Sequence, residues 1–257
     1  MSSLPSTRVM VSDGPWDITD PDWPTYQAPD VTTGLALRWT ADALTALADG
    51  ASITSWPSTG PETLTLGSKG TTPQWPTLKR DALGEHSAAQ FDSACIGTPV
   101  NSSAPTILAA GEEATIVMVT KATTTITVDH RLLTTSGYPD PDKYRGLRGM
   151  STGAVAVFDP SGALYSSAGS IAGTWAVIVA STSASGTILA INDTVNQSAT
   201  PITGELRGLR LGAAAGTEPG PASFYPGLIA ETRIYRRALT LADVQGLITQ
   251  LRYTYGI

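Results

Sequence analysis

The sequence predicts an all-β fold, a two-sheet antiparallel sandwich with an extended N-terminal arm and a short C-terminal helix. From residue 34 onward, short apolar runs alternate with turn residues at intervals of roughly 8–14 positions, which is typical of a sandwich or barrel. Residues 1–33 lack such periodicity and are rich in proline and aromatic residues. The C-terminal segment from Phe224 to Ile257 reads instead as one strand followed by one helix.

The N-terminal arm, residues 1–33, is predicted to be extended. Proline fixes the local backbone and excludes both a helix and a central strand in this segment. An isolated extended segment would expose Trp16, Trp23 and Tyr26 to water, so we expect these side chains to anchor the arm on a surface. That surface belongs either to a partner subunit, for which the arm would be a docking segment, or to the sandwich of the same chain.

The domain of residues 34–257 carries the predicted strands. The run at 114–121 is almost continuously apolar and is expected to be a central strand, whereas the run at 123–130 alternates between apolar and polar residues. A short helical turn is expected at 41–47. The other predicted strands lie at 35–39, 52–56, 153–159, 162–167, 174–181, 186–193, 206–212 and 227–235.

The C-terminal segment combines an alternating strand with a capped helix. In the strand at 227–235, the even positions are predicted to share the core face, while Glu231 and Arg233 lie on the solvent face as a surface or cross-strand pair. Thr240 and Asp243 have the spacing of a capping box, and an apolar stripe at helical spacing follows them. We expect this helix to pack across a sheet edge or the open end of the sandwich, and to serve packing rather than chemistry.

Composition and charge narrow the function classes. The net charge of −6 gives no concentrated basic face, so nucleic acid is not expected as a partner. The single cysteine, Cys95, cannot form an intrachain disulfide and is expected to be a small buried side chain. No apolar run is long enough to span a membrane, so membrane insertion is not expected, and the N-terminus lacks the pattern of a signal peptide.

Several blocks of the sequence resemble the laminin-G-like, concanavalin-A-like jelly-roll domains found in bacterial surface proteins and phage tail proteins. The block at 35–60 has that family's opening strand, helical turn and Trp-ending strand, and Phe91 stands at its FD position. The block at 173–195 pairs a Trp-bearing strand with one that ends at Asn192-Asp193, a dipeptide compatible with a type I′ hairpin. The most specific block is Phe224–Thr240.

The resemblance implies two antiparallel sheets packed face to face, in a fold that serves carbohydrate binding, protein interaction or structural roles. Relatives that hydrolyse glucans carry alternating acids on one strand, because alternation puts the nucleophile and the general acid on the same face. No strand here has such a set, since Glu112 and Glu113 are adjacent and Glu231 stands alone. No nucleophile-elbow, zincin or P-loop motif occurs, and we predict that the protein is not an enzyme.

No cofactor is expected from the sequence. Some relatives bind calcium at the rim of the sandwich, and calcium takes roughly six to eight oxygen ligands. Asp140 and Asp142 form the best local cluster, but two acids in a proline-rich loop are more typical of a solvated turn. A rim site built from separate loops by Asp92, Asp129 and Asp193 stays open as an alternative.

The loop from Tyr138 to Arg145 is the predicted ligand- or partner-binding site of the sandwich. Tyrosine rings stack on the C–H faces of sugars, charged side chains bond hydroxyl groups, and long loops on rigid sandwiches commonly carry binding. An ordinary rim loop is the alternative. The predicted site residues are Tyr138, Asp140, Asp142, Lys143, Tyr144 and Arg145.

Together these features predict a non-enzymatic bacteriophage virion protein, a minor tail or tail-tip protein that adheres to the host cell surface through wall glycans. Its expected partners are other virion subunits, including further copies in a homo-oligomer, and host surface polysaccharide. Two alternatives stay open: a structural decoration protein without a ligand of its own, and a lectin-like carbohydrate-binding module of a bacterial surface protein. The missing signal-peptide pattern counts against the second alternative.

Overall fold

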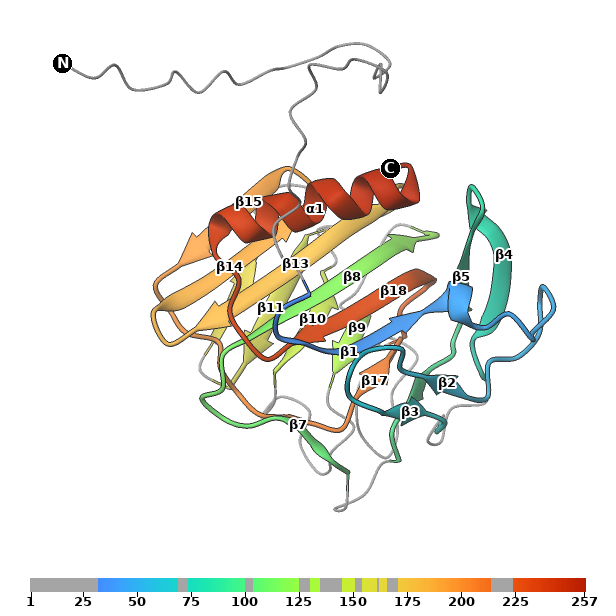
Figure 1. The fold of residues 1–257 in the computed structure, drawn as a ribbon, viewed down its shortest axis with the longest axis horizontal. Coiled ribbons are helices and arrows are strands. Elements are labelled where there is room, and N and C mark those ends of the chain that lie inside the picture. Colours follow the sequence, from blue (N-terminus) through green and yellow to red (C-terminus); the bar gives the residue numbers. More distant parts are fainter. Residues whose placement is uncertain are drawn as a thin grey trace, which may run out of the picture.

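Two antiparallel β-sheets pack face to face, and one helix covers the outer face of the larger sheet (Figure 1). This computed structural model describes residues 32–68, 74–99, 104–124, 130–134, 145–150, 154–160, 162–165, 171–213 and 224–257. The predicted all-β sandwich is confirmed. The anchoring residues of the predicted arm, Trp16, Trp23 and Tyr26, lie outside the described residues.

The larger sheet is built around strand β18, the strand of the most specific sequence block. β18 pairs along its length with β8, and its other edge pairs first with β5 and then with β1. The bounds, in sheet order, are β15 (Thr194–Ser198), β14 (Gly186–Ile191), β13 (Ala176–Ser183), β8 (Ala114–Ala122), β18 (Gly227–Tyr235), β5 (His86–Phe91) and β4 (Thr77–Leu83), with β1 (Leu35–Thr40) beside β18.

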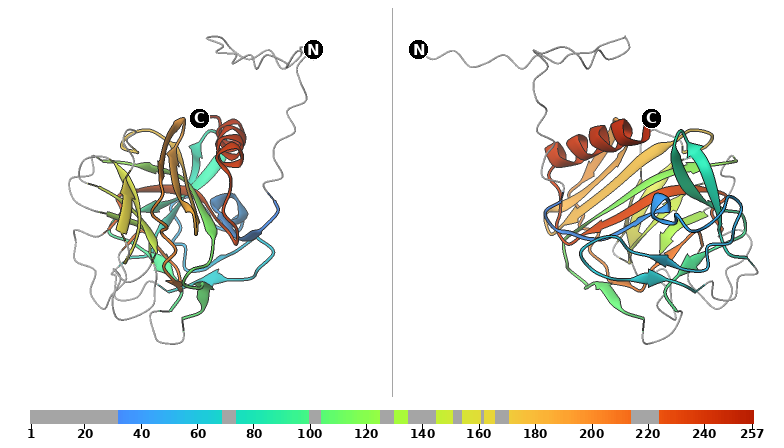
Figure 2. Two further views of the ribbon diagram at one scale, coloured as in Figure 1. Left: turned by 90° about the vertical axis from the view of Figure 1, so that its left-hand side faces the viewer. Right: turned by 45° about the vertical axis from the view of Figure 1, so that its right-hand side comes forward.

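The smaller sheet lies on the other side of the core and is made of shorter strands (Figure 2). In sheet order its strands are β12 (Gly162–Tyr165), β11 (Val155–Asp159), β10 (Gly146–Gly149), β9 (His130–Thr134), β17 (Arg210–Leu211) and β6 (Ile96–Gly97). Two short pairs and one 3-10 turn complete the described elements: β2 (Trp56–Pro57) with β3 (Thr65–Leu66), β7 (Thr106–Leu108) with β16 (Leu206–Arg207), and η1 (Ala41–Ala43).

The inner core fills the space between the two sheets. Apolar side chains from alternate positions of the strands meet there, as the period of two requires. β8 is buried almost throughout, which confirms the prediction of a central strand at 114–121. Cys95 is buried as predicted. The largest buried side chains of this core include Trp39, Trp56, Phe91 and Tyr225.

Helix α1 (Leu241–Tyr255) begins and ends with strong capping signals. The Thr240 side chain accepts a hydrogen bond from the Asp243 backbone, and the Asp243 side chain accepts one from the Thr240 backbone, which confirms the predicted capping box. Gly256 closes the helix in the left-handed conformation. Within the described part of the chain, no helix is long and apolar enough to cross a membrane.

The outer core lies between α1 and the larger sheet. Valines of β8 and β13 point away from the inner core on this face, and the apolar stripe of α1 covers them. The helix therefore lies on a sheet face, and the prediction that it crosses an edge or an open end is wrong (Figure 2). The outer core consists chiefly of Val117, Val119, Val177, Val179, Val244, Leu247, Ile248 and Leu251.

Strand β18 departs from the alternation predicted for it. Its register with β8 shifts between Ile229 and Glu231, and a β-bulge of this kind moves the following side chains to the opposite face. Ala230, at the bulge, packs in the outer core, whereas Ile234, after the bulge, packs in the inner core. The prediction that the even positions share one face is therefore wrong. Glu231 and Arg233 are buried rather than exposed, so the prediction that they face solvent is also wrong.

Candidate functional site

Two hollows lie on the outer face beside β15, one next to the segment that leads into α1 and the other next to α1 itself. The first, here called the serine hollow, has a volume of about 300 Å³. The second, here called the helix hollow, has a volume of about 230 Å³. Both open beside the edge strand β15, which is the last strand of the larger sheet in this direction.

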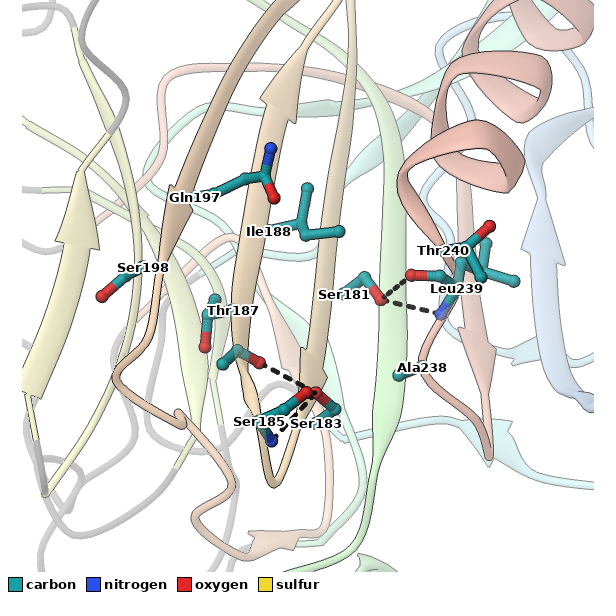
Figure 3. Close-up of a pocket in the computed structure, with 11 residues that line it drawn as sticks. Ser181, Ser183, Ser185, Thr187, Ile188, Gln197, Ser198, Ala238, Leu239 and Thr240 are labelled. Carbon is teal, nitrogen blue, oxygen red and sulfur yellow. Dashed lines mark hydrogen bonds between the residues drawn. The ribbon is translucent and has the colours of Figure 1, made fainter.

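The serine hollow is lined by the β13–β14 hairpin on one side and by the segment that leads into α1 on the other. Figure 3 shows hydroxyl groups from both sides around the same space. Its floor is partly apolar, because Ile188 lies on the outer face of β14. The lining residues are Ser181, Ser183, Ser185, Gly186, Thr187, Ile188, Gln197, Ser198, Ala238, Leu239 and Thr240.

Ser181 fixes the two walls of the serine hollow relative to each other. Its Oγ accepts a hydrogen bond from the Leu239 backbone N–H at 2.7 Å and donates one to the Leu239 carbonyl at 2.8 Å (Figure 3). Thr115 Oγ1 also donates to Ser181 Oγ, at 3.2 Å. This buried hydroxyl is fully used in tying the segment before α1 to β13, so it shapes the hollow and is not available to a ligand.

Polar groups at the mouth of the serine hollow remain able to bond a ligand. Ser183 and Ser185 stand at the hairpin turn with 2.9 Å between their Oγ atoms, and a hydroxyl pair of this kind retains further acceptor capacity. Gln197 is exposed, and its side-chain amide makes no hydrogen bond to any described residue. The amide offers two donor hydrogens and an acceptor oxygen toward the hollow.

The helix hollow continues from the serine hollow along β15 and α1. Ile188 pairs with Gln197 and Ala190 pairs with Val195, so Gln197 and Val195 are successive side chains on the same face of β15. Gln197 lines the first hollow and Val195 lines the second, which places the two hollows next to each other. The lining residues of the helix hollow are Asn192, Asp193, Val195, Gln245, Ile248 and Thr249.

The Asn192-Asp193 turn lies at one end of the helix hollow. Asn192 has a φ of 49°, a conformation that asparagine tolerates better than most residues. Its backbone N–H donates to the Val177 carbonyl, and its Oδ1 accepts from the Val177 N–H at 2.8 Å, so the turn is anchored to β13. Asp193 receives a hydrogen bond from Arg252 Nη1 at 2.6 Å, which joins the turn to α1.

The hollows are nearly free of charge. None of the residues that line the serine hollow is ionisable as an acid or a base. Asp193 is the one charged residue among those that line the helix hollow, and it is paired with Arg252. This chemistry suits a neutral ligand that is rich in hydroxyl or amide groups, with a few polar contacts over a partly apolar floor.

The predicted binding loop is described only at its last residue. Arg145 is buried, its backbone N–H donates to the Glu205 carbonyl, and its Nη2 donates to the Glu112 carbonyl at 2.7 Å. Burial lowers the pKa of Arg145 to about 10. The other predicted members, Tyr138, Asp140, Asp142, Lys143 and Tyr144, lie outside the described residues, and a ligand site in this loop stays a prediction.

Glu231 has a structural environment rather than that of a catalytic acid. Its carboxylate receives hydrogen bonds from Arg233 Nε at 2.7 Å, from Tyr255 Oη at 2.7 Å and from Arg38 Nε. Burial alone would raise the pKa of Glu231, but the guanidinium groups of Arg233 and Arg38 outweigh burial and lower this pKa. The carboxylate is thus held ionised and enclosed beneath α1.

The described residues contain no group of three or more His, Cys, Asp or Glu side chains placed to hold one metal ion. Of the acids considered for a rim calcium site, Asp193 is engaged with Arg252. Asp129, Asp140 and Asp142 lie outside the described residues.

Of the residues that line the two hollows, the sequence indicates only Asp193 as a candidate ligand, and that for calcium. The C-terminal segment was correctly assigned to packing on its buried face, but its exposed face contributes Gln245 and Thr249 to the helix hollow. The sequence feature that could have pointed to the serine hollow is the run of small, mostly polar residues at 181–186 beside a hairpin turn. Serine-rich turns are common on protein surfaces, so this signal alone would not have identified a site.

The two antiparallel sheets packed face to face define the class of β-sandwich proteins. The family model described as the concanavalin A-like lectin/glucanases superfamily matches residues 109–245, which is more than half of the chain. The chain belongs to this superfamily, and the sequence resemblance is confirmed. No curated protein matches the chain.

Several solved structures share the fold at low sequence identity. The Trypanosoma rangeli sialidase in complex with sialic acid matches with a TM-score of 0.52 and 12% identity, over 85% of this chain and 33% of the sialidase. The botulinum neurotoxin serotype D ligand binding domain in complex with N-acetylneuraminic acid gives a TM-score of 0.56 and 11% identity, over 87% of this chain and 52% of that one. The receptor binding domain of the botulinum neurotoxin C/D mosaic serotype gives a TM-score of 0.58 and 10% identity, over 86% of this chain and 52% of that one. This chain therefore spans about a third of the sialidase and about half of each toxin domain.

Proposed function

We propose that the protein binds carbohydrate without transforming it, and that it does so as a minor tail or tail-tip protein of a phage particle that adheres to glycans of the host cell wall. The serine hollow carries this proposal. It is an uncharged space of about 300 Å³ with hydroxyl and amide groups at its mouth, on a fold whose solved neighbours include two complexes with sialic acid. Such a surface matches the neutral polyhydroxylated surface of a sugar.

The absence of catalysis is part of the proposal. Most glycoside hydrolases use a pair of carboxyl groups that flank the scissile bond. The serine hollow is lined by no carboxylate, and the helix hollow has Asp193 alone, already paired with Arg252. Glu231, the acid of β18, is enclosed by two arginines and a tyrosine. These arrangements favour binding over hydrolysis.

The virion role rests on the resemblance of the sequence blocks to phage tail domains and on the proposed docking arm. Purified particles should contain the protein, and removal of residues 1–33 should abolish its incorporation while residues 34–257 still fold. A truncated protein that enters particles normally would contradict the docking role of the arm. A protein absent from particles but retained on host walls would favour a lectin-like module of a bacterial surface protein.

Sugar binding is tested with the purified protein and host wall polysaccharide, by sedimentation and by isothermal titration calorimetry. Gln197→Ala should weaken binding about tenfold, because a hydrogen bond in the binding site is lost. Ala184→Ser is the matched control, since it changes the hairpin turn without removing a polar group from the hollow. Wild-type protein that leaves all wall glycans unbound would refute sugar binding and favour a decoration protein.

The predicted loop is tested in the same assay. Tyr138→Ala and Tyr144→Ala should leave wall binding unchanged if the serine hollow holds the sugar. Loss of binding in these two variants, with Gln197→Ala unaffected, would move the site to the loop.

A further inference from the structure

We infer that the serine hollow and the helix hollow form one continuous groove, extended by Tyr253, that takes a neutral, linear oligosaccharide chain rather than a terminal sialic acid. This inference rests on the proposed glycan binding and specifies its ligand class. Three features carry it: the continuity of the two hollows, one exposed aromatic ring beside them, and the near absence of charged side chains in their lining.

Continuity follows from the pairing of β14 with β15. The side chains of Gln197 and Val195 are successive on the outer face of β15, and they line the first and the second hollow respectively. The opposite wall runs from Thr240 at the start of α1 to Thr249 in its third turn. β15 forms one side of a single groove, and α1 with the segment that leads into it forms the other.

Tyr253 continues the exposed edge of this groove. Gln245, Thr249 and Tyr253 follow one another at four-residue spacing on the exposed side of α1, and each is turned by about 40° from the one before, so Tyr253 lies at the outer lip of the groove. Tyr253 is 80% exposed and is the large hydrophobic residue that stands out to solvent among the described residues. An exposed aromatic ring in line with a polar groove is available for stacking on the apolar face of a sugar ring.

The groove is longer than one sugar. Thr240 and Tyr253 are separated by about 20 Å along the axis of α1, at 1.5 Å for each residue. A monosaccharide can fill only one of the two hollows at a time, whereas an oligosaccharide can contact Gln197, Gln245 and Tyr253 together. Affinity should therefore grow with chain length until the groove is filled.

The charge of the groove selects against sialic acid. A sialic acid carboxylate is held most strongly by a cation, through charge-assisted hydrogen bonds. Arg252, a cation beside the helix hollow, is already engaged, because its Nη1 donates to Asp193 and its Nε donates to the Ile257 carbonyl. A carboxylate entering the helix hollow would instead meet Asp193, and like charges repel. The neutral groove thus favours a different ligand class from those named in the sialidase and toxin complexes.

The test uses a printed array of neutral oligosaccharides, from monosaccharide to hexasaccharide on each backbone, together with sialylated counterparts, followed by calorimetry on the bound series. We expect neutral chains to bind with affinity that rises with length. Tyr253→Ala should weaken the longest bound chain about tenfold, a typical loss for one contacting aromatic residue, and leave the shortest bound chain unchanged. Tyr253→Phe keeps the ring and should bind as wild type.

The outcomes separate this inference from the function on which it rests. Thr254→Ala, at an exposed position of α1 outside the groove lining, is the control for changes at the end of the helix. Binding that is independent of length, unaffected by Tyr253→Ala, or restricted to sialylated glycans would overturn the groove while leaving sugar binding intact. Binding to no glycan on the array would overturn both.

Discussion

The hydroxyl of Tyr255 donates a hydrogen bond to the carboxylate of Glu231, with 2.7 Å between Oη and Oε2, and both groups are buried between α1 and the larger sheet. Arg233 and Arg38 supply the other partners of this carboxylate. The helix that closes the outer core is therefore attached to the sheet by a buried polar bond as well as by apolar packing. Such a bond is directional, and it fixes the position of α1 along the groove wall.

Tyr255→Phe should destabilise the protein by about 1.5–3 kcal/mol, the usual contribution of a hydrogen bond to a charged group. The ring is retained, so packing changes little and the loss reports on the bond to Glu231. Urea unfolding followed by circular dichroism measures the free energy of unfolding. Tyr253→Phe removes the same hydroxyl from an exposed ring and should change this free energy by less than about 0.5 kcal/mol. Equal effects of the two variants would contradict the structural role of Tyr255.

The sequence predicted those parts of the fold that depend on local signals. Alternating apolar runs located most strands, and Thr240 with Asp243 located the start of α1 because a capping box is a local arrangement. The bulge in β18 was not predictable, since the sequence of Ile229–Glu231 contains no glycine or proline to mark it. One extra residue there reversed the assignment of faces for the rest of the strand.

The groove could not be predicted from the sequence for a different reason. Its walls come from the β13–β15 strands and from α1, which are distant in sequence and meet only after the sheet has formed. Ser183, Gln197 and Gln245 are polar residues of the kind found on any surface. Only their shared position around one space gives them a candidate role.

Thr240→Ala should destabilise the protein by about 1 kcal/mol, because it removes the side-chain acceptor that caps the Asp243 backbone N–H. Thr240→Ser keeps an acceptor hydroxyl and should lose only a small part of this free energy. The midpoint of urea unfolding compares the three proteins under one condition. A serine variant as unstable as the alanine variant would show that the methyl group, not the cap, stabilises this position.

Gly186→Ala should destabilise the β14–β15 hairpin and distort the serine hollow. Gly186 has a φ of +148°, and a Cβ at this position would collide with the Ser198 carbonyl oxygen. Gly162→Ala is the matched control, since Gly162 has a similar φ of +157° but a Cβ there meets no atom within 4 Å. The control should lose about 1–3 kcal/mol from backbone strain alone, and Gly186→Ala should lose clearly more. Similar losses in the two variants would contradict the close approach of β15 to Gly186.

His86 should make stability depend on pH near neutrality. Its Nδ1 lies 2.7 Å from Asp42 Oδ2 and its Nε2 lies 2.9 Å from the Thr254 carbonyl oxygen at the end of α1. Both partners are acceptors, so both bonds form together only when the ring is protonated. The hydrogen bond to Asp42 raises the pKa of His86 above its ordinary value, although partial burial opposes this shift.

A histidine whose folded-state pKa is raised contributes stability that is fully present below its unfolded-state pKa of about 6.5 and is lost as pH rises through the folded-state value. The free energy of unfolding should therefore fall as pH rises from about 6.5 through the raised folded-state pKa of His86. His86→Gln keeps a polar side chain without a titrating ring and should remove this fall. Urea unfolding across the pH series measures the difference between the two proteins, and NMR titration of the His86 ring gives its folded-state pKa directly. A wild-type protein that gains stability relative to His86→Gln over this interval would contradict the bond between His86 and the end of α1.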